Sequence, residues 1–335
     1  KFKILTFGIS NNYGALLQSL YLKTYLTKKL GLKVEVSNFI PFKLFYRENL
    51  KNFLKKNPFK IIENYKKIRS IKKWKKINSV DYFPNFFERK ITEKITIYGS
   101  DEIWNYSNPF FGYKSFYFGS KNKNKKIAYA VSIGNANIEN MSEEHSNEIG
   151  TFLKSFDLIT VRDQNTSRFV THLTGEAPLI VVDPTLLLNE HEEGFIKPKK
   201  IEFKYALIYG TYFPDNEKKK ILNYCQKKNL TILSVGYFNN WVDKNIMNAD
   251  PSDFLNYVIN SSIVFTSMFH GVIFSTKFKR QFWISMDPYR RNKLTYFLDY
   301  LGLKEQIIHP KSDFEKLFNY ENINTKLYNW IEKSK

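Results

Sequence analysis

The sequence predicts an α/β fold in two domains, each a parallel sheet covered by helices. Short apolar stretches alternate with helical stretches along nearly the whole chain, which is the pattern of βαβ units. At 335 residues the chain exceeds what one hydrophobic core usually organises, and its hydrophobic content of 43% is enough for two cores. Small and polar residues follow several of the apolar stretches, as is typical where such sheets bind ligands.

The first Rossmann-like domain is expected to span residues 1–190. Its predicted strands are residues 3–7, 33–37, 94–98, 126–134, 156–161 and 179–182. A helix is predicted over residues 15–28, after a turn of small and amide residues from Gly8 to Gly14. Such a turn either presents helix N–H groups to an anion or merely connects a strand to a helix, and the sequence leaves both interpretations open.

A basic helical excursion interrupts this domain at about residues 41–90. Residues 41–76 contain 13 lysines and arginines against two glutamates, an excess of 11 within a chain of formal net charge +20. Apolar residues near helical spacing predict basic amphipathic helices that break at Pro58. Two interpretations remain: a helix that touches an anionic membrane, or a solvated surface helix. We expect no nucleic-acid partner, because no helix-turn-helix, zinc-finger or RNA-recognition pattern accompanies the charge.

The second Rossmann-like domain is expected over residues 201–310, beyond a polar linker at residues 190–194. Its predicted strands are residues 204–210, 230–236, 263–265 and 281–286. One helix is predicted to begin near Pro251 with Ser252 as its N-cap. Residues 311–335 are expected to supply a C-terminal helix that packs back across the domains.

The most informative residue is His270, which follows the apolar run of residues 263–265. Ligands of open α/β sheets bind at the carboxyl ends of the strands, and Gly271 is suited to a close approach of backbone and ligand. Because histidine titrates near neutral pH, His270 is a candidate general acid or base. The alternative is a histidine that only packs in the structure.

Three further charged residues follow predicted strands. Arg162 is a candidate anion ligand, and its alternative role is an ion pair with Asp163 or another carboxylate. Asp101 is either a binding residue or a helix N-cap. Asp183 precedes a proline and is expected to hold a turn rather than transfer a proton.

Other features limit the chemistry. The single cysteine, Cys225, excludes an internal disulfide and lies in a helix-like stretch that suggests packing. No closely spaced histidines and carboxylates form a metal-ligand pattern, so no metal is implied. No apolar run approaches the roughly 20 residues that span a bilayer, and the first residues look like a strand, so we expect a cytoplasmic protein, at most peripheral at the inner face of the membrane.

Five motifs together resemble those of the polysaccharide pyruvyl transferases. They are residues 12–18 (NYGALLQ), 99–105 (GSDEIWN), 161–163 (VRD), 182–187 (VDPTLL) and 269–275 (FHGVIFS). Their order and spacing match, and the resemblance runs from about Phe2 to about Ile308.

The resemblance implies an architecture similar to that of GT-B glycosyltransferases, with two domains facing across a cleft. It also implies that phosphoenolpyruvate is the donor and that no cofactor is tightly bound. The implied acceptor is a bacterial polysaccharide or its precursor, linked to a nucleotide or to a lipid pyrophosphate. The product would be a pyruvate ketal that bridges two sugar hydroxyls, with release of phosphate.

The resemblance also implies roles for individual residues. His270 matches the family's acid/base position, and Arg162 matches an arginine that holds the phosphate or carboxylate of the donor. Some relatives carry a cationic residue after the histidine, at a position that falls near Arg290 or Arg291. Some relatives also carry an arginine at the position of Met268. The residues expected to line the cleft are Asn12, Gly14, Ser100, Asp101 and Gly271.

Other functions remain as alternatives. A GT-B-like glycosyltransferase would use a nucleotide sugar instead of phosphoenolpyruvate. A catalytically silent saccharide-binding relative would explain the loss of a cation at Met268. A basic nucleic-acid binder would show steep salt dependence.

Overall fold

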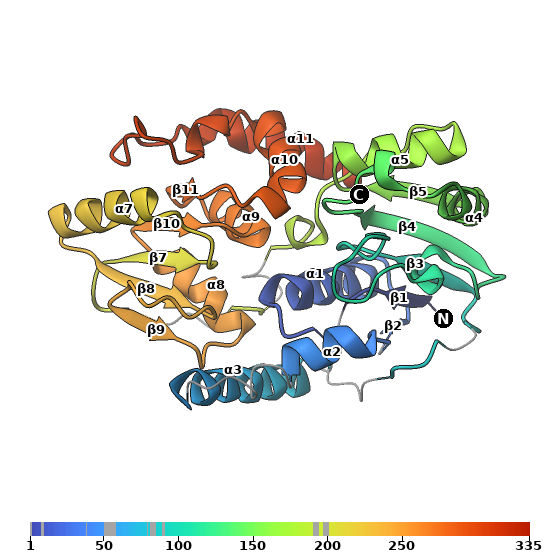
Figure 1. The fold of residues 1–335 in the computed structure, drawn as a ribbon, viewed down its shortest axis with the longest axis horizontal. Coiled ribbons are helices and arrows are strands. Elements are labelled where there is room, and N and C mark those ends of the chain that lie inside the picture. Colours follow the sequence, from blue (N-terminus) through green and yellow to red (C-terminus); the bar gives the residue numbers. More distant parts are fainter. Residues whose placement is uncertain are drawn as a thin grey trace. The chain divides into compact units, whose positions relative to one another are not determined.

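The computed structural model describes residues 2–7, 10–37, 39–49, 58–78, 80, 85–88, 91–189, 194–196 and 201–335 (Figure 1). The chain divides into two compact units. Unit 1 contains Lys1–Lys51, Lys75–Leu188 and Trp330–Lys335. Unit 2 contains Asn52–Trp74 and Asn189–Asn329. Most of the predicted linker, residues 190–193, lies outside the described residues.

Unit 1 is built on a parallel sheet of six strands in the order β2-β1-β3-β4-β5-β6. The strands are β1 Phe2–Leu5, β2 Val34–Val36, β3 Ile95–Tyr98, β4 Lys125–Val131, β5 Leu158–Val161 and β6 Leu179–Ile180. The helices of this part of the chain are α1 Tyr13–Thr24, α2 Phe42–Asn49, α4 Glu143–Leu153 and α5 Gln164–Thr174. Every strand pair is parallel, so the carboxyl ends of all six strands share one edge.

The central strands of unit 1 are buried on both faces, which explains their continuous apolar sequences. On one face, Leu5, Tyr98 and Val131 belong to a large aromatic-rich core. On the other face, Ile4 and Ile97 pack with residues of α1 and β2.

Unit 2 is built on a parallel sheet of five strands in the order β11-β10-β7-β8-β9. The strands are β7 Tyr205–Tyr209, β8 Thr231–Val235, β9 Lys244–Ile246, β10 Ile263–Thr266 and β11 Phe282–Ile284. The helices are α7 Asp215–Lys227, α8 Pro251–Asn260, α9 Phe269–Lys277, α10 Arg291–Leu301 and α11 Tyr320–Ser334. The short edge strand β9 was not predicted, because its sequence, Lys-Asn-Ile, lacks an apolar pattern. The fold class predicted from the sequence, α/β with two parallel sheets, is confirmed.

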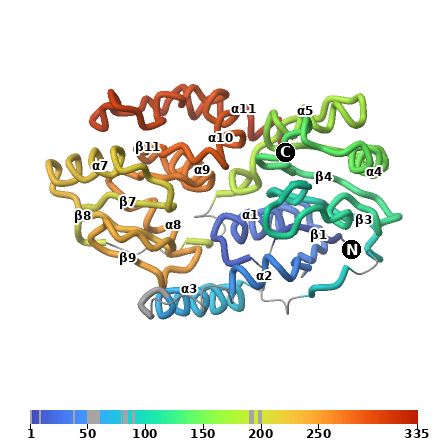
Figure 2. Tube along the Cα trace, viewed as in Figure 1, coloured from blue at the N-terminus to red at the C-terminus, as the bar shows by residue number. Residues whose placement is uncertain are grey.

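The two units exchange segments. Residues Asn52–Trp74, which include most of helix α3 (Pro58–Ile77), belong to unit 2, although the sequence placed the basic excursion in the first domain. Helix α11 ends in unit 1, where the Trp330 indole donates a hydrogen bond to the carbonyl of Ile180. Figure 2 shows this last segment, in red, running to the C-terminus beside the green strands of unit 1.

The start of helix α8 corrects one prediction. Its N-cap is Asp250, whose carboxylate accepts from the backbone N–H of Asp253, while the Asp253 carboxylate accepts from the N–H of Asp250. This reciprocal capping leaves the hydroxyl of Ser252, the predicted cap, to accept a hydrogen bond of 2.8 Å from the Trp74 indole.

Candidate functional site

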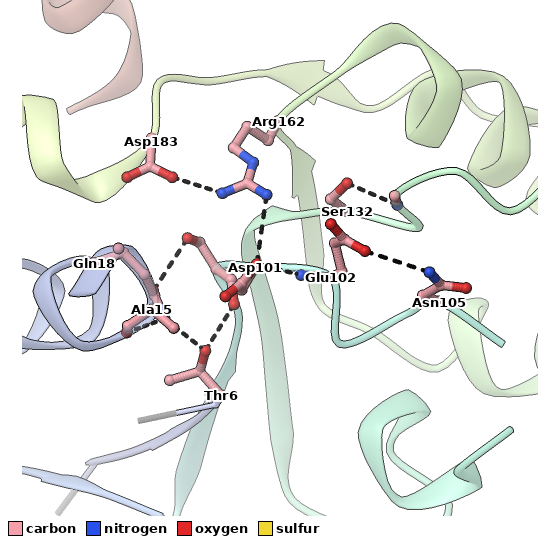
Figure 3. Close-up of polar contacts among 12 residues, drawn as sticks. Thr6, Ala15, Gln18, Asp101, Glu102, Asn105, Ser132, Arg162 and Asp183 are labelled. Atoms are coloured by element: carbon pink, nitrogen blue, oxygen red, sulfur yellow. Dashed lines mark hydrogen bonds and ion pairs between the residues drawn. The ribbon is translucent and has the colours of Figure 1, made fainter. Parts of the chain in front are cut away.

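Arg162 lies at the carboxyl edge of the unit 1 sheet, immediately after β5 (Figure 3). Its side chain is only 3% exposed and its Nη1 atom is 2.6 Å from Oδ2 of Asp183, whose side chain is fully buried. Its Nη2 atom is 3.8 Å from Oδ1 of Asp101, which is 16% exposed. Burial by itself would lower the pKa of the Arg162 guanidinium, but the two carboxylates outweigh burial and raise it.

This geometry excludes the helix-cap interpretation of Asp101 and identifies Asp183 as the ion-pair partner of Arg162. Asp101 caps no helix; it faces Arg162 and accepts a hydrogen bond from the N–H of Glu102. Arg162 pairs with Asp183, which also caps the turn at Pro184 through hydrogen bonds from Thr185. The guanidinium is thus covered on one side by the buried Asp183 carboxylate, and its Nη2 atom on the Asp101 side is buried as well.

Ser100 has a structural role in unit 1. It is fully buried, and its hydroxyl donates to Oε1 of Gln18. The Gln18 amide donates to the Thr6 hydroxyl, and that hydroxyl donates to the Ser100 carbonyl. Figure 3 labels Gln18 and Thr6 in its lower part. These bonds join β1, α1 and the loop after β3, so Ser100 fixes the backbone that carries Asp101.

Asp163 supports the same edge at the start of helix α5. Its carboxylate accepts hydrogen bonds from the Ser132 hydroxyl and from the backbone N–H and hydroxyl of Thr166, which makes Asp163 the N-cap of α5. Burial raises the pKa of the Asp163 carboxyl despite these hydrogen bonds. Asp163 is thus tied to the helix cap and is not the hydrogen-bonded partner of Arg162.

The turn before α1 is satisfied by its own residues. Asn12 is the N-cap, and its side-chain oxygen accepts from the backbone N–H groups of Gly14 and Ala15. The Asn12 backbone oxygen accepts from Leu16. Capping therefore explains Asn12 and Gly14 without a ligand, and it removes most of the N–H groups that an anion would need there.

His270 is the second residue of α9, at the carboxyl edge of the unit 2 sheet. Its ring is half-buried and lies against the rings of Phe269 and Phe274. Thr266 holds the start of this helix, because its hydroxyl donates to the Tyr209 carbonyl and accepts from the N–H of Met268. The imidazole is therefore placed by a rigid strand-to-helix turn rather than by a loop.

The backbone itself explains Gly271. A Cβ atom at this position would lie 2.1 Å from the Thr266 hydroxyl oxygen and 3.0 Å from the Tyr209 ring. The glycine thus allows α9 to approach β10 and β7, a close approach to protein that the sequence did not predict; the approach to a ligand stays a prediction.

Arg290 and Arg291 follow β11, the strand next to β10, so they share the carboxyl edge with His270. Arg290 is ion-paired with Asp287. Arg291 is exposed in the first turn of α10, and the described part of the chain provides no ion pair for it. Met268 is only 9% exposed and caps α9 without a side-chain hydrogen bond. Arg291 is consequently the more accessible of the two arginines.

One acidic residue at this edge of unit 2 was missed. Glu217 lies in the first turn of α7, and burial raises the pKa of its carboxyl, while the nearby Ser285 hydroxyl opposes the rise. Ser285 follows β11, so the two side chains come from two elements at the carboxyl edge. The sequence gave no signal, because an acid in the first turn is ordinary for any helix.

Three other features of the described residues concern cavities, metal binding and membrane spans. A hollow of about 360 Å³ lies in unit 1 at the amino ends of β5 and β6, at the opposite edge from Arg162. Within the described ranges, no three histidine, cysteine or acidic side chains are grouped to hold a metal ion. None of the described helices combines the length and the apolar character needed to cross a bilayer.

Comparison with solved structures supports the architecture. A UDP-N-acetylglucosamine 2-epimerase superposes with a TM-score of 0.51 at 11% identity, covering 99% of this chain and 89% of that chain. A putative UDP-N-acetylglucosamine 2-epimerase from Listeria monocytogenes gives a TM-score of 0.49 at 11% identity, over 99% and 88% of the two chains. No curated protein sequence matches the chain. Identity this low shows the fold alone: the chain has an α/β fold of the GT-B type.

The sequence family is more specific than the fold. The family model for polysaccharide pyruvyl transferases matches residues 12–285, most of the chain. The protein belongs to this family and is accordingly a transferase of polysaccharide biosynthesis. The match includes Arg162 and His270 and ends before Arg290 and Arg291.

Proposed function

We propose that the protein transfers the pyruvate unit of phosphoenolpyruvate onto two hydroxyls of a sugar in a bacterial polysaccharide or its precursor. A proton adds to the methylene carbon of the donor and makes it a methyl group. One sugar hydroxyl then bonds to the carbon that carries the phosphate, and the second hydroxyl displaces the phosphate. Two hydroxyl protons are released for the one taken up by carbon, and the products are a cyclic ketal and inorganic phosphate.

The observation that carries the proposal is the family match over residues 12–285. It is supported by His270, a half-buried imidazole held at the carboxyl edge of a parallel sheet, where α/β enzymes bind their ligands. The reaction needs a group that both gives and takes protons near neutral pH, and an imidazole does this. We assign the acid/base role to His270.

Two arginines are proposed to bind the anionic groups of the donor. Arg291 is exposed beside the same sheet edge as His270, and it replaces the cation that Met268 removes. For Arg162, which is buried in its pair with Asp183, the donor-binding role rests on the family motif alone. Both the phosphate and the carboxylate of phosphoenolpyruvate suit the planar fork of a guanidinium.

The remaining expectations follow from this chemistry. The acceptor is a saccharide linked to a nucleotide or to a lipid pyrophosphate, and the enzyme acts at the cytoplasmic side of the membrane, where phosphoenolpyruvate is made. The arginines neutralise the donor, so the proposal needs no bound cofactor or divalent metal.

Calorimetric titration of phosphoenolpyruvate tests the proposal without knowledge of the acceptor. We expect saturable binding to the wild type that exceeds the binding of inorganic phosphate and pyruvate. Arg291→Gln should weaken it by about tenfold or more, since a charged hydrogen bond contributes roughly 1.5–3 kcal/mol. Arg168→Gln is the matched control, because Arg168 is an exposed arginine on α5 outside the candidate site.

The outcomes separate the alternatives. Binding of a UDP-sugar without binding of phosphoenolpyruvate would replace the proposal with glycosyl transfer. Normal phosphoenolpyruvate binding with no phosphate release across a panel of saccharide acceptors would indicate a silent relative. An equal loss of affinity in Arg291→Gln and Arg168→Gln would remove Arg291 from the site.

A further inference from the structure

Helix α3 is anchored on unit 2 by one side only. The Lys67 ammonium donates a 2.7 Å hydrogen bond to the Gly236 carbonyl and lies 4.8 Å from the centre of the Tyr237 ring. The Trp74 indole donates to Ser252 of α8, and Ile71 is fully buried. Positions 67, 71 and 74 recur at helical spacing, so these three residues define a single inward side.

The opposite side of α3 is exposed and carries almost only cations and apolar residues. We call it the basic face of α3. It consists of Ile62, Tyr65, Lys66, Arg69, Lys72, Lys73, Lys76 and Ile77, all of which are exposed.

The apolar residues of the basic face are large and well exposed. Ile62 is 51% exposed, Tyr65 is 54% exposed and Ile77 is 67% exposed. They lie on the same face as the cations because positions 62, 65, 69, 73 and 76 recur at steps of three and four. These three side chains therefore lie outside the buried core.

The charge of the basic face is mostly uncompensated. Glu63 pairs with Lys66 at 2.7 Å, which neutralises one cation. For Arg69, Lys72, Lys73 and Lys76, the described ranges contain no ion pair. Four cations on one helix face repel one another, so the arrangement favours an anionic partner.

We propose that the basic face of α3 binds the surface of an anionic lipid bilayer. Lysines and arginines on such a helix pair with anionic lipid headgroups, while the apolar and aromatic side chains enter the boundary between headgroups and acyl chains. The exposed Ile62, Tyr65 and Ile77 distinguish this partner from a nucleic acid, whose phosphates would engage the cations and leave the isoleucines in water. The helix then lies along the membrane plane with unit 2 on its cytoplasmic side.

Vesicle sedimentation of the full-length protein tests the proposal. We expect the wild type to bind vesicles of phosphatidylcholine with phosphatidylglycerol, and not vesicles of phosphatidylcholine alone. The variant Arg69→Gln/Lys72→Gln/Lys73→Gln should bind on the order of 100-fold more weakly, given the contribution of each cation near an anionic membrane.

A control variant with the same net charge distinguishes an effect of the basic face of α3 from an effect of the protein's net charge. Lys123→Gln/Lys219→Gln/Lys311→Gln removes three exposed lysines outside α3, for which the described residues supply no ion pair. It should bind the anionic vesicles within about twofold of the wild type, since it leaves every cation of the basic face in place and salt screens other exposed charges. All variants change exposed side chains, and circular dichroism checks that they remain folded.

A third variant tests the apolar part of the face. Ile62→Ser/Tyr65→Ser keeps every charge and should weaken vesicle binding by at least tenfold, because it removes buried apolar area. The proposal is overturned if the two triple variants lose vesicle binding equally, or if millimolar inorganic phosphate releases the protein from the vesicles. It is also overturned if vesicle binding stays intact in the α3 triple variant while RNA binding is lost.

Discussion

Arg162 shows how a residue found by its motif depends on partners that the motif does not reveal. Its guanidinium is buried between one fully buried carboxylate and one partly exposed carboxylate. Removing one member of a buried ion pair leaves the other charge uncompensated, at a cost of about 3–5 kcal/mol. The two aspartates should therefore differ sharply in how much they stabilise the fold.

We expect Asp183→Asn to lower the free energy of unfolding by about 3 kcal/mol, because it breaks the 2.6 Å ion pair while keeping an oxygen for Thr185. Asp101→Asn should cost about 1 kcal/mol or less, because its carboxylate is 3.8 Å from Arg162 and partly solvated. Urea unfolding followed by tryptophan fluorescence measures both. Equal losses would show that Asp101 and Asp183 hold Arg162 to the same degree.

Cys225 should be chemically silent in the native protein. It is 1% exposed on α7, and burial raises the pKa of its thiol to about 12. At pH 8 only about one molecule in 10⁴ then carries the reactive thiolate, so iodoacetamide should modify the native protein far more slowly than the urea-unfolded protein. Mass spectrometry follows the reaction, and rapid labelling under native conditions would show that α7 opens.

At the level of single residues, the sequence identified Arg162, His270 and Asp101 because each follows a predicted strand. It did not identify Asp183 as the partner of Arg162, since that pairing depends on β5 and β6 being adjacent in the sheet. Nor did it show that Asn12 caps α1, that Ser100 is buried against Gln18, or that Gly271 makes room for Thr266. These are contacts between elements, and their donors and acceptors are common residue types.

At the level of elements, substitutions of two glycines test how closely helix α9 packs on strand β10. Gly271→Ala places a methyl group 2.1 Å from the Thr266 hydroxyl oxygen and should destabilise the protein by about 1–3 kcal/mol. Gly150→Ala in the last turn of α4 meets only an ordinary contact at 3.4 Å and should stabilise by about 0.5–1 kcal/mol, because alanine is the better helix former. Thermal unfolding should shift in opposite directions, and a stabilised Gly271→Ala variant would contradict the close packing.

The strands were predictable because parallel strands covered on both faces have continuous apolar sequences, as Tyr205–Tyr209 has. Helix α3 was also predictable as a helix that begins at Pro58. Its place in unit 2 was not, because an apolar stripe with Ile71 and Trp74 fits any apolar surface. Only the positions of Gly236, Tyr237 and Ser252 in the folded chain decide where that stripe packs.

For the whole molecule, the exchange of segments means that a single cut cannot divide the chain into its two units. Unit 2 needs Asn52–Trp74 from the first half of the chain, and unit 1 needs Trp330–Lys335 from its end. In unit 1 the Trp330 side chain is 4% exposed and bound to Ile180, and the Ser334 hydroxyl accepts from the N–H of Val182. The N-terminal half of the chain therefore carries a buried segment of unit 2, and the C-terminal half carries a buried segment of unit 1.

We accordingly expect that a protease site inserted after Asn189 yields two fragments that stay together after cleavage. Each fragment keeps buried contacts with the other, through Trp74 on Ser252 and through Trp330 on Ile180. The double variant Trp74→Ala/Trp330→Ala removes both anchors, each worth about 3–5 kcal/mol as a buried aromatic side chain, and should let the fragments separate. Trp241→Ala/Phe213→Ala is the control, because that aromatic pair lies within the second fragment alone. Size-exclusion chromatography of the cleaved proteins shows whether the two fragments elute together. The exchanged segments do not hold the fragments together if those of the cleaved wild type separate. The same conclusion follows if the fragments of the control separate as readily as those of the Trp74→Ala/Trp330→Ala variant.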